Sequence, residues 1–201
     1  MLSLTARIEL LEKDLSATPP AFTMNADLPF ALFRYDPTQP EEPEWEMRRQ
    51  MKLLATRVEK TTGKSVHLLS LAKFYWQSIE QTEGVATIVG LEQESGFPAA
   101  EAQVHCYLSD PDWRPLPQLL AEAVADYRSE RDILFLYRAG VFAPTSYRIS
   151  SLLEQLMGDV SVPAILFYPG SWRSGSLNYL GLRGEQEPLG SYRVKIYGRE
   201  A

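Results

Sequence analysis

The chain has one cysteine and two histidines among its 201 residues, which excludes several kinds of functional site. Cys106 has no second cysteine with which to form an internal disulfide, as is typical of a protein from a reducing compartment. One cysteine and two distant histidines do not supply zinc ligands at any usual spacing. We expect Cys106 to be a small buried residue and not a nucleophile, because Cys106 and the adjacent His105 project in different directions from a predicted helix.

Long hydrophobic runs are also missing. No apolar run approaches the roughly 18 residues of a membrane span, and the first residues place acids where a signal peptide would have apolar side chains. We therefore expect a cytoplasmic protein.

The common nucleotide and hydrolase motifs are absent too. No G-x-G-x-x-G follows a predicted strand, and no G-x-S-x-G elbow occurs. The run Gly63-Lys64-Ser65 matches the end of a phosphate-binding P-loop, but Val58 stands where the first loop glycine should be. The run also follows a predicted helix and opens a strand, which is the reverse of a P-loop. We expect a helix end followed by a turn, with Lys64 not a phosphate ligand.

The net charge of −6 is unevenly distributed. The first 132 residues carry −8 and the remainder carries +2. The overall charge argues against bulk nucleic-acid binding, and the basic excess falls in the last third of the chain.

The strongest structural pattern lies in residues 132–170. Residues 133–136 and 164–167 are unbroken apolar runs, as in strands that are buried on both faces. Between them Ile149, Leu152, Leu153 and Leu156 recur at helical spacing. The pattern predicts a βαβ unit with two adjacent parallel strands, whose carboxyl ends lie at the edge where open α/β folds place their functional crevice.

The flanking sequence predicts the rest of an α/β fold. An amphipathic helix is expected in residues 1–20, and Leu28 to Tyr35 reads as a strand. Short segments near Tyr179 to Leu182 and Tyr192 to Tyr197 are expected to pair as an edge hairpin. The prediction is a single domain over residues 1–201, with a mostly parallel central sheet, flanking helices and an antiparallel C-terminal edge hairpin.

Basic and aromatic side chains follow the predicted central strands. Guanidinium groups and aromatic faces suit carboxylates, phosphates or protein hot spots, although the arginines could equally pair with nearby acids such as Glu154 and Glu185. Asp36 is the only acid directly after a predicted strand, and one carboxylate is weak support for a magnesium site. We assign no catalytic residue, metal or cofactor. The candidate partner-binding or phosphate-binding residues are Arg138, Arg148, Tyr168, Trp172, Arg173, Arg193 and Lys195.

Five stretches in the last third of the chain carry a resemblance to a known family. They are Phe135 to Gly140 (FLYRAG), Leu152 to Leu156 (LLEQL), Val162 to Gly170 (VPAILFYPG), Tyr179 to Leu182 (YLGL) and Tyr192 to Tyr197 (YRVKIY). With these stretches the sequence resembles the BrxB family, a component of the BREX (bacteriophage exclusion) systems of bacteria and archaea. The resemblance implies a non-catalytic or uncharacterised subunit that works beside a PglZ-like protein of the alkaline-phosphatase superfamily, a PglX-type DNA methyltransferase and a large ATPase. It supplies no catalytic residues.

Three functions follow as hypotheses. The first is a non-catalytic protein-binding subunit of a BREX complex, with the PglZ-like protein as partner. The second is a nucleotide- or nucleic-acid-binding protein that holds phosphates on the basic residues. The third is a hydrolase or nuclease of an unrecognised type.

Overall fold

The computed structural model describes residues 2–17, 30–173, 176–180, 186–187 and 194–198. The chain divides into two compact units. The sheet unit comprises residues 1–69, 127–137 and 161–201, and the helical unit comprises residues 70–126 and 138–160. That residues 1–201 form a single domain stays a prediction.

The sheet unit is built on a central sheet with the strand order β2-β3-β4-β1-β7. The strands are β1 (Phe30–Tyr35), β2 (Ser65–Ser70), β3 (Asp132–Tyr137), β4 (Ala164–Arg173) and β7 (Lys195–Tyr197). Strand β4 is parallel to both β3 and β1, and β7 is parallel to β1. Leu134 lies opposite Ala164, so the predicted parallel pairing of residues 133–136 with 164–167 is confirmed. The α/β class and the mostly parallel sheet are confirmed with it.

The antiparallel edge is formed by the second half of β4. Strand β5 (Ser176–Tyr179) pairs antiparallel with the end of β4, and β6 (Gln186–Glu187) pairs with β5. At Gly170 a Cβ atom would lie 2.4 Å from the Asn178 carbonyl oxygen, so only glycine fits this close approach. The expected pairing of residues 179–182 with 192–197 is wrong for its described residues, because β7 instead adds to the parallel sheet beside β1.

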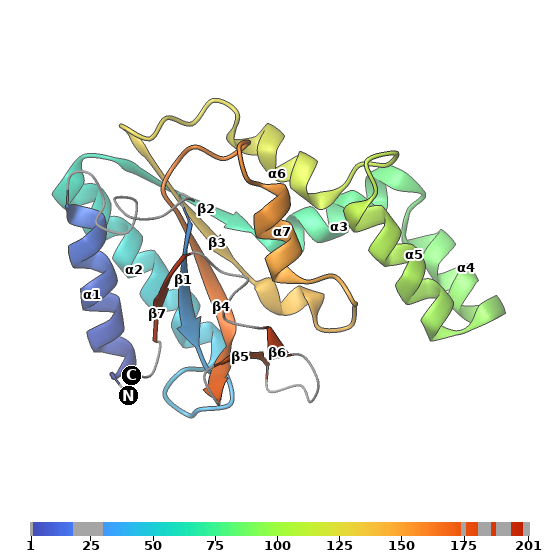
Figure 1. The fold of residues 1–201 in the computed structure, drawn as a ribbon, viewed down its shortest axis with the longest axis horizontal. Helices are drawn as coiled ribbons and strands as arrows, with labels where there is room; N and C mark the ends of the chain where they lie inside the picture. Colours follow the sequence, from blue (N-terminus) through green and yellow to red (C-terminus); the bar gives the residue numbers. More distant parts are fainter. Residues whose placement is uncertain (1, 18–29, 174–175, 181–185, 188–193, 199–201) are drawn as a thin grey trace. The chain divides into compact units, whose positions relative to one another are not determined.

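Helices α1 (Leu4–Ser16) and α2 (Glu44–Thr62) pack against the sheet (Figure 1). Their apolar side chains join those of the strands in one buried core, in which the ring of Phe167 lies 5.5 Å from Phe33 and 5.3 Å from Phe135. Helix α2 ends at Gly63, which has φ 72° and so takes the left-handed conformation of a helix cap. The helix stop predicted at Gly63 is therefore confirmed, as is the N-terminal amphipathic helix.

The helical unit contains α3 (Leu71–Thr82), α4 (Val85–Ser95), α5 (Phe97–Ser109), α6 (Leu116–Val124), the 3-10 turn η1 (Ala139–Phe142) and α7 (Ile149–Gln155). The leucines of the predicted stripe on α7 are buried, Leu153 at 2% exposure. Ser78 ties the helices together by donating to the carbonyl oxygens of Tyr107 and Arg114, at 2.9 and 2.8 Å.

Cys106 is exposed, so its expected burial is wrong. The buried residues of α5 are Ala100, Val104, Tyr107 and Leu108, which recur at helical spacing. Cys106 falls outside this stripe and faces solvent.

Candidate functional site

A cavity of about 380 Å³ opens at the carboxyl end of β1 in the sheet unit. This is the edge at which parallel sheets usually place a site. Its walls come from the start of α1, the end of β1 and the loop that leads to α2. The lining residues are Leu2, Ser3, Leu4, Arg34, Asp36, Gln39, Glu41 and Glu42.

Two buried arginines form the base of this region. Arg7 comes from α1 and is fully buried, and Arg34 comes from β1 and is 1% exposed. Arg7 forms an ion pair with Glu42, donates from Nη1 to the Arg34 carbonyl oxygen, and lies with Cζ 5.7 Å from the Phe33 ring centroid. Burial lowers the pKa of the Arg7 guanidinium, and the Glu42 carboxylate acts against this shift. The Glu42 carboxylate therefore offsets part of the cost of burying the Arg7 charge.

Arg34 links β1 to β4 and to the residue that follows β7. Its Nε donates to the Gly198 carbonyl oxygen at 3.0 Å, and its Nη1 donates to the Gly170 carbonyl oxygen at 3.3 Å. Gly198 follows β7 with φ 99°, and a Cβ atom there would lie 3.1 Å from both Arg34 Nε and Arg7 Nη1. The positive φ favours glycine at this position, and a Cβ atom would also make a tight contact with the two guanidinium groups.

The carboxylates beside the arginines are also bonded within the protein. The Asp36 backbone N–H donates to Glu42 Oε2 at 2.8 Å. Asp36 Oδ1 accepts from the Thr38 backbone N–H and hydroxyl at 3.1 and 2.7 Å, which fixes the turn after β1. The arrangement holds α1, the β1–α2 loop and the strands together, and none of the described lining residues is a cysteine, histidine or lysine.

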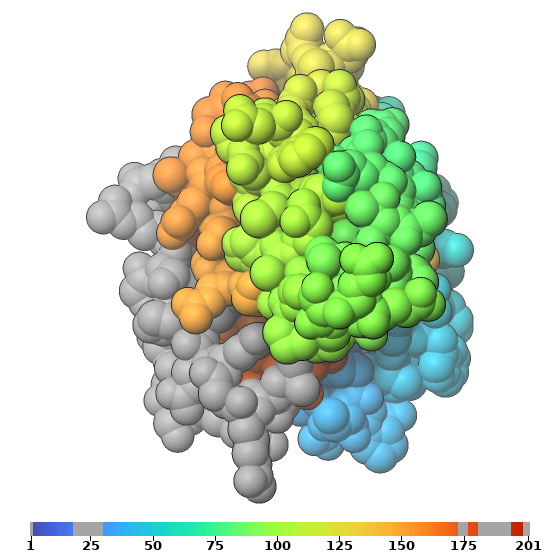
Figure 2. Space-filling model, turned by 90° about the vertical axis from the view of Figure 1, so that its right-hand side faces the viewer, coloured from blue at the N-terminus to red at the C-terminus, as the bar shows by residue number. Residues whose placement is uncertain are grey.

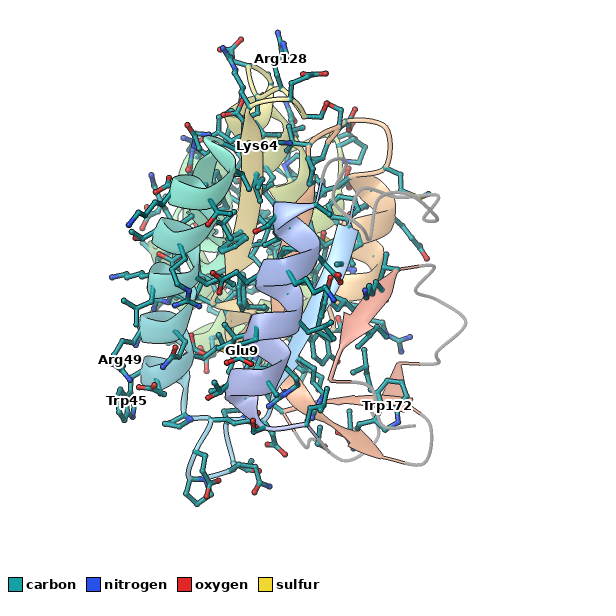
Figure 3. The ribbon with its side chains drawn as sticks, turned by 90° about the vertical axis from the view of Figure 1, so that its left-hand side faces the viewer. Glu9, Trp45, Arg49, Lys64, Arg128 and Trp172 are labelled. Carbon is teal, nitrogen blue, oxygen red and sulfur yellow. The ribbon has the colours of Figure 1, made fainter. Side chains whose placement is uncertain are left out.

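The predicted binding residues of the sheet unit are spread over two strands. Tyr168 is buried and Trp172 is 8% exposed, both on β4, and Arg173 is the last residue of that strand. Lys195 on β7 lies opposite Ala31, near the amino end of β1, and pairs with Asp14 of α1. Figure 3 shows Trp172 at the same end of the sheet unit as Trp45. Arg193 lies outside the described residues.

The other two predicted residues, Arg138 and Arg148, belong to the helical unit. Both side chains are exposed. Arg138 has φ 62°, an uncommon conformation for a residue other than glycine, and Arg148 precedes α7. A binding role for any of the seven candidates stays a prediction.

Sequence reasoning missed Arg7, Arg34 and Glu42, although two of them carried a signal. Arg7 precedes Ile8 and Leu11 on the apolar stripe of the N-terminal helix, and Arg34 interrupts an otherwise apolar strand. A charged residue at a position that the pattern assigns to the core indicates a buried ion pair.

A second polar cluster lies where β2 meets β3. His67 Nε2 is 2.8 Å from Asp132 Oδ1, and the His67 ring stacks on Tyr127 with centroids 4.0 Å apart. Burial acts to raise the pKa of Asp132, but hydrogen bonds from His67, from the Arg128 backbone N–H and from Arg131 outweigh it and lower the pKa. The cluster anchors the start of β3.

Lys64 lies at the end of the sheet unit opposite Trp45 (Figure 3). Its Nζ donates to the Ser129 carbonyl oxygen at 2.8 Å. The lysine of the Gly63-Lys64-Ser65 run therefore has a contact within the fold.

Within the described ranges, no group of three or more His, Cys, Asp and Glu side chains could hold a metal ion. No helix in the same ranges is long and apolar enough to cross a membrane.

A comparison with models of known protein families finds a match to this chain. The model described as "BREX protein BrxB" matches residues 67–194, well over half of the chain, whereas searches of the curated proteins and of the solved structures found no match. The matched range takes in the whole helical unit and strands β3 and β4, and leaves out α1, β1 and α2 with Arg7, Arg34 and Glu42. The chain therefore belongs to the BrxB family and is a component of a BREX phage-defence system.

Proposed function

We propose that this chain is a non-catalytic, protein-binding subunit of a cytoplasmic BREX complex, and that its direct partner is the PglZ-like protein of the same system. The observation that carries the proposal is the exposure of large apolar side chains. Trp76 and Phe97 of the helical unit are 51% and 55% exposed. Aromatic residues of this kind are enriched at protein interfaces.

The polar cavity at the end of β1 supports the same proposal. Arg7 is paired with Glu42, Arg34 bonds two carbonyl oxygens, and Asp36 fixes a turn. Charged groups that are committed to one another hold a fold together and are poorly placed to take part in a reaction.

The experiment that tests this proposal is co-expression with the PglZ-like protein encoded beside this chain. Size exclusion with light scattering should find a stable complex of the two proteins. If the PglZ-like protein elutes alone in every buffer tried, the proposed partner is wrong.

Phosphate binding is the second candidate, and Arg138 and Arg148 favour it. Both are exposed, and neither forms an ion pair with any described residue. If phosphates bind here, Arg138→Ala and Arg148→Ala should weaken DNA binding, and the wild-type affinity should fall steeply with salt. Arg49→Ala, on an exposed arginine of α2, is the matched control.

Arg138→Ala and Arg148→Ala also distinguish the protein-binding function from phosphate binding. Under the protein-binding proposal, one or both should weaken the complex with the PglZ-like protein and reduce phage restriction. Trp172→Ala is a poor test of binding, because Trp172 is nearly buried and its removal would disturb the packing around β4.

A further inference from the structure

An apolar groove lies in the helical unit between α3, α4 and α5. It has a volume of about 250 Å³, and ten of its thirteen lining residues are apolar or aromatic. Figure 2 turns the surface of these helices, in green, toward the viewer. The lining residues are Tyr75, Trp76, Ile79, Val85, Ile88, Val89, Glu92, Phe97, Ala100, Glu101, Val104, Pro144 and Thr145.

The groove is open, and its apolar walls meet solvent. Trp76, Val89 and Phe97 are 51%, 46% and 55% exposed. Helix α4, which forms one wall, contains no buried residue although it carries Val85, Ile88 and Val89. Soluble proteins rarely leave a contiguous apolar surface of this kind without a binding role.

The size and shape of the groove favour a protein segment over a small molecule. Pockets for drug-sized ligands usually enclose about 300 to 1,000 Å³ and bury most of the ligand. This groove is smaller, and its wall residues are exposed. A helix that inserts a few apolar side chains and keeps its other face in water fits such a surface.

The charge of the helical unit favours a partner helix that is basic. Residues 70–126 and 138–160 contain eleven Asp and Glu against four Lys and Arg, a net charge of −7. The sheet unit carries the remaining +1 of the total of −6. Two acids, Glu92 and Glu101, lie in the groove lining itself. A second copy that docked through its own helical unit would bring two acidic surfaces together, whereas a basic helix is attracted.

From the exposed apolar lining and the surrounding acids, we propose that the α3–α4–α5 groove binds an amphipathic helix of a partner protein. The apolar face of this helix enters the groove, and Lys or Arg residues flank that face. Helix α4 has 11 residues, so the groove wall runs for roughly 16 Å and takes about three turns of the bound helix. This inference rests on the proposed protein-binding function and names its surface and the chemistry of its partner.

Two glycines bound the helix that forms this wall. Gly84 and Gly96 have φ of 82° and 83°, values that favour glycine, and they allow the chain to turn sharply before and after α4. Helix α4 packs mainly against α5. Since none of its residues is buried, the wall formed by α4 belongs to no buried core.

The experiment uses the full chain and a set of 20-residue peptides that tile every protein encoded in the same BREX system. Binding is measured by fluorescence anisotropy. The peptides that bind should be amphipathic at helical spacing and carry a net positive charge, and their affinity should fall as salt is raised.

Two variants and two matched controls locate the site. Val89→Glu and Trp76→Ala should each weaken binding at least about tenfold, as expected at a hot spot. Leu53→Glu is the control for the first, because Leu53 and Val89 are both 46% exposed on a helix. Trp45→Ala is the control for the second. Both controls should bind as the wild type does, and circular dichroism should show all four variants to be folded.

The outcomes separate this inference from the proposed partner. If the bound peptides come from another BREX protein and the groove variants still weaken them, the groove stands and the PglZ-like partner is wrong. If the PglZ-like protein forms a complex that Val89→Glu and Trp76→Ala leave unchanged, the partner stands and the groove is wrong. If no peptide binds, or if the bound peptides are acidic, the groove inference is overturned.

Discussion

The cavity of the sheet unit and the groove of the helical unit differ in almost every property. The cavity has two buried arginines beneath it and several carboxylates in its wall, and Arg7, Arg34, Asp36 and Glu42 are bonded to other groups of the unit. The groove is lined mainly by apolar side chains that face solvent, with two acids among them. In this protein a concave polar site at a sheet edge holds its own charged groups together, while the surface that we propose for a partner lies on the helices.

Breaking the ion pair below the cavity should have the largest effect. Arg7→Met leaves the Glu42 carboxylate buried without its cation, which should lower the free energy of unfolding by about 3 to 5 kcal/mol. Urea unfolding measures this change. The control is Arg49→Met, since the Arg49 side chain is 59% exposed in its pair with Glu46, and it should cost less than about 1 kcal/mol. Equal small losses would mean that the Arg7 pair does not hold the sheet unit together.

A substitution in the core of the helical unit tests whether the two units unfold together. Leu153→Ala should cost about 2 to 5 kcal/mol, because Leu153 is 2% exposed and its removal leaves a cavity. Met157→Ala, at a residue that is 49% exposed, should cost under about 0.5 kcal/mol. If the chain is one cooperative domain, Leu153→Ala and Arg7→Met should each shift a single transition. Two separate transitions, each moved by one variant, would make the units independent domains.

The cluster at the start of β3 should show its contribution in the pH dependence of stability. Fold contacts lower the pKa of Asp132, so its carboxylate stabilises the protein above its unfolded pKa of about 4, and this stability is lost as the pH falls through the folded value. Asp132→Asn should cost about 1 to 3 kcal/mol at pH 7. The difference from wild type should shrink in urea melts at pH 3, and a difference that is constant between pH 7 and pH 3 would contradict this.

The smallest effect is expected at Lys64. Lys64→Ala removes one hydrogen bond to the Ser129 carbonyl oxygen and should cost about 1 kcal/mol or less. Phage restriction should be unchanged. ATP binding that Lys64→Ala abolishes in calorimetry would show that Lys64 is a phosphate ligand after all.

The central fold could be predicted because its signals are local and repeated. Apolar runs at 133–136 and 164–167 with a helical stripe between them specify two parallel strands, and the structure pairs Leu134 with Ala164. The hairpin error had a different cause. Residues 195–197 form a short strand whose pairing depends on a distant edge, and no local pattern indicates that this edge belongs to β1.

The surfaces were harder to predict than the fold. The exposed Trp76 and Val89 fit a helical pattern as well as buried residues would, so sequence spacing alone assigns them to the core. Arg7 and Glu42 are separated by 35 positions, and their pairing depends on how α1 docks beside the β1–α2 loop. The exposure of Trp76 and Val89 and the pairing of Arg7 with Glu42 both depend on how distant elements pack together. Local sequence patterns contain little information about that packing.

The position of β1 in the sheet has a consequence for how the protein is made. Both neighbours of β1 come late in the chain, since β4 begins at Ala164 and β7 at Lys195. A ribosome therefore releases Phe30–Tyr35, an almost entirely apolar strand, long before either partner exists. Nascent chains that expose such a strand are prone to aggregation. We therefore expect that β1 stays shielded by α1, α2 or a chaperone during synthesis, and that fragments ending before residue 164 are insoluble.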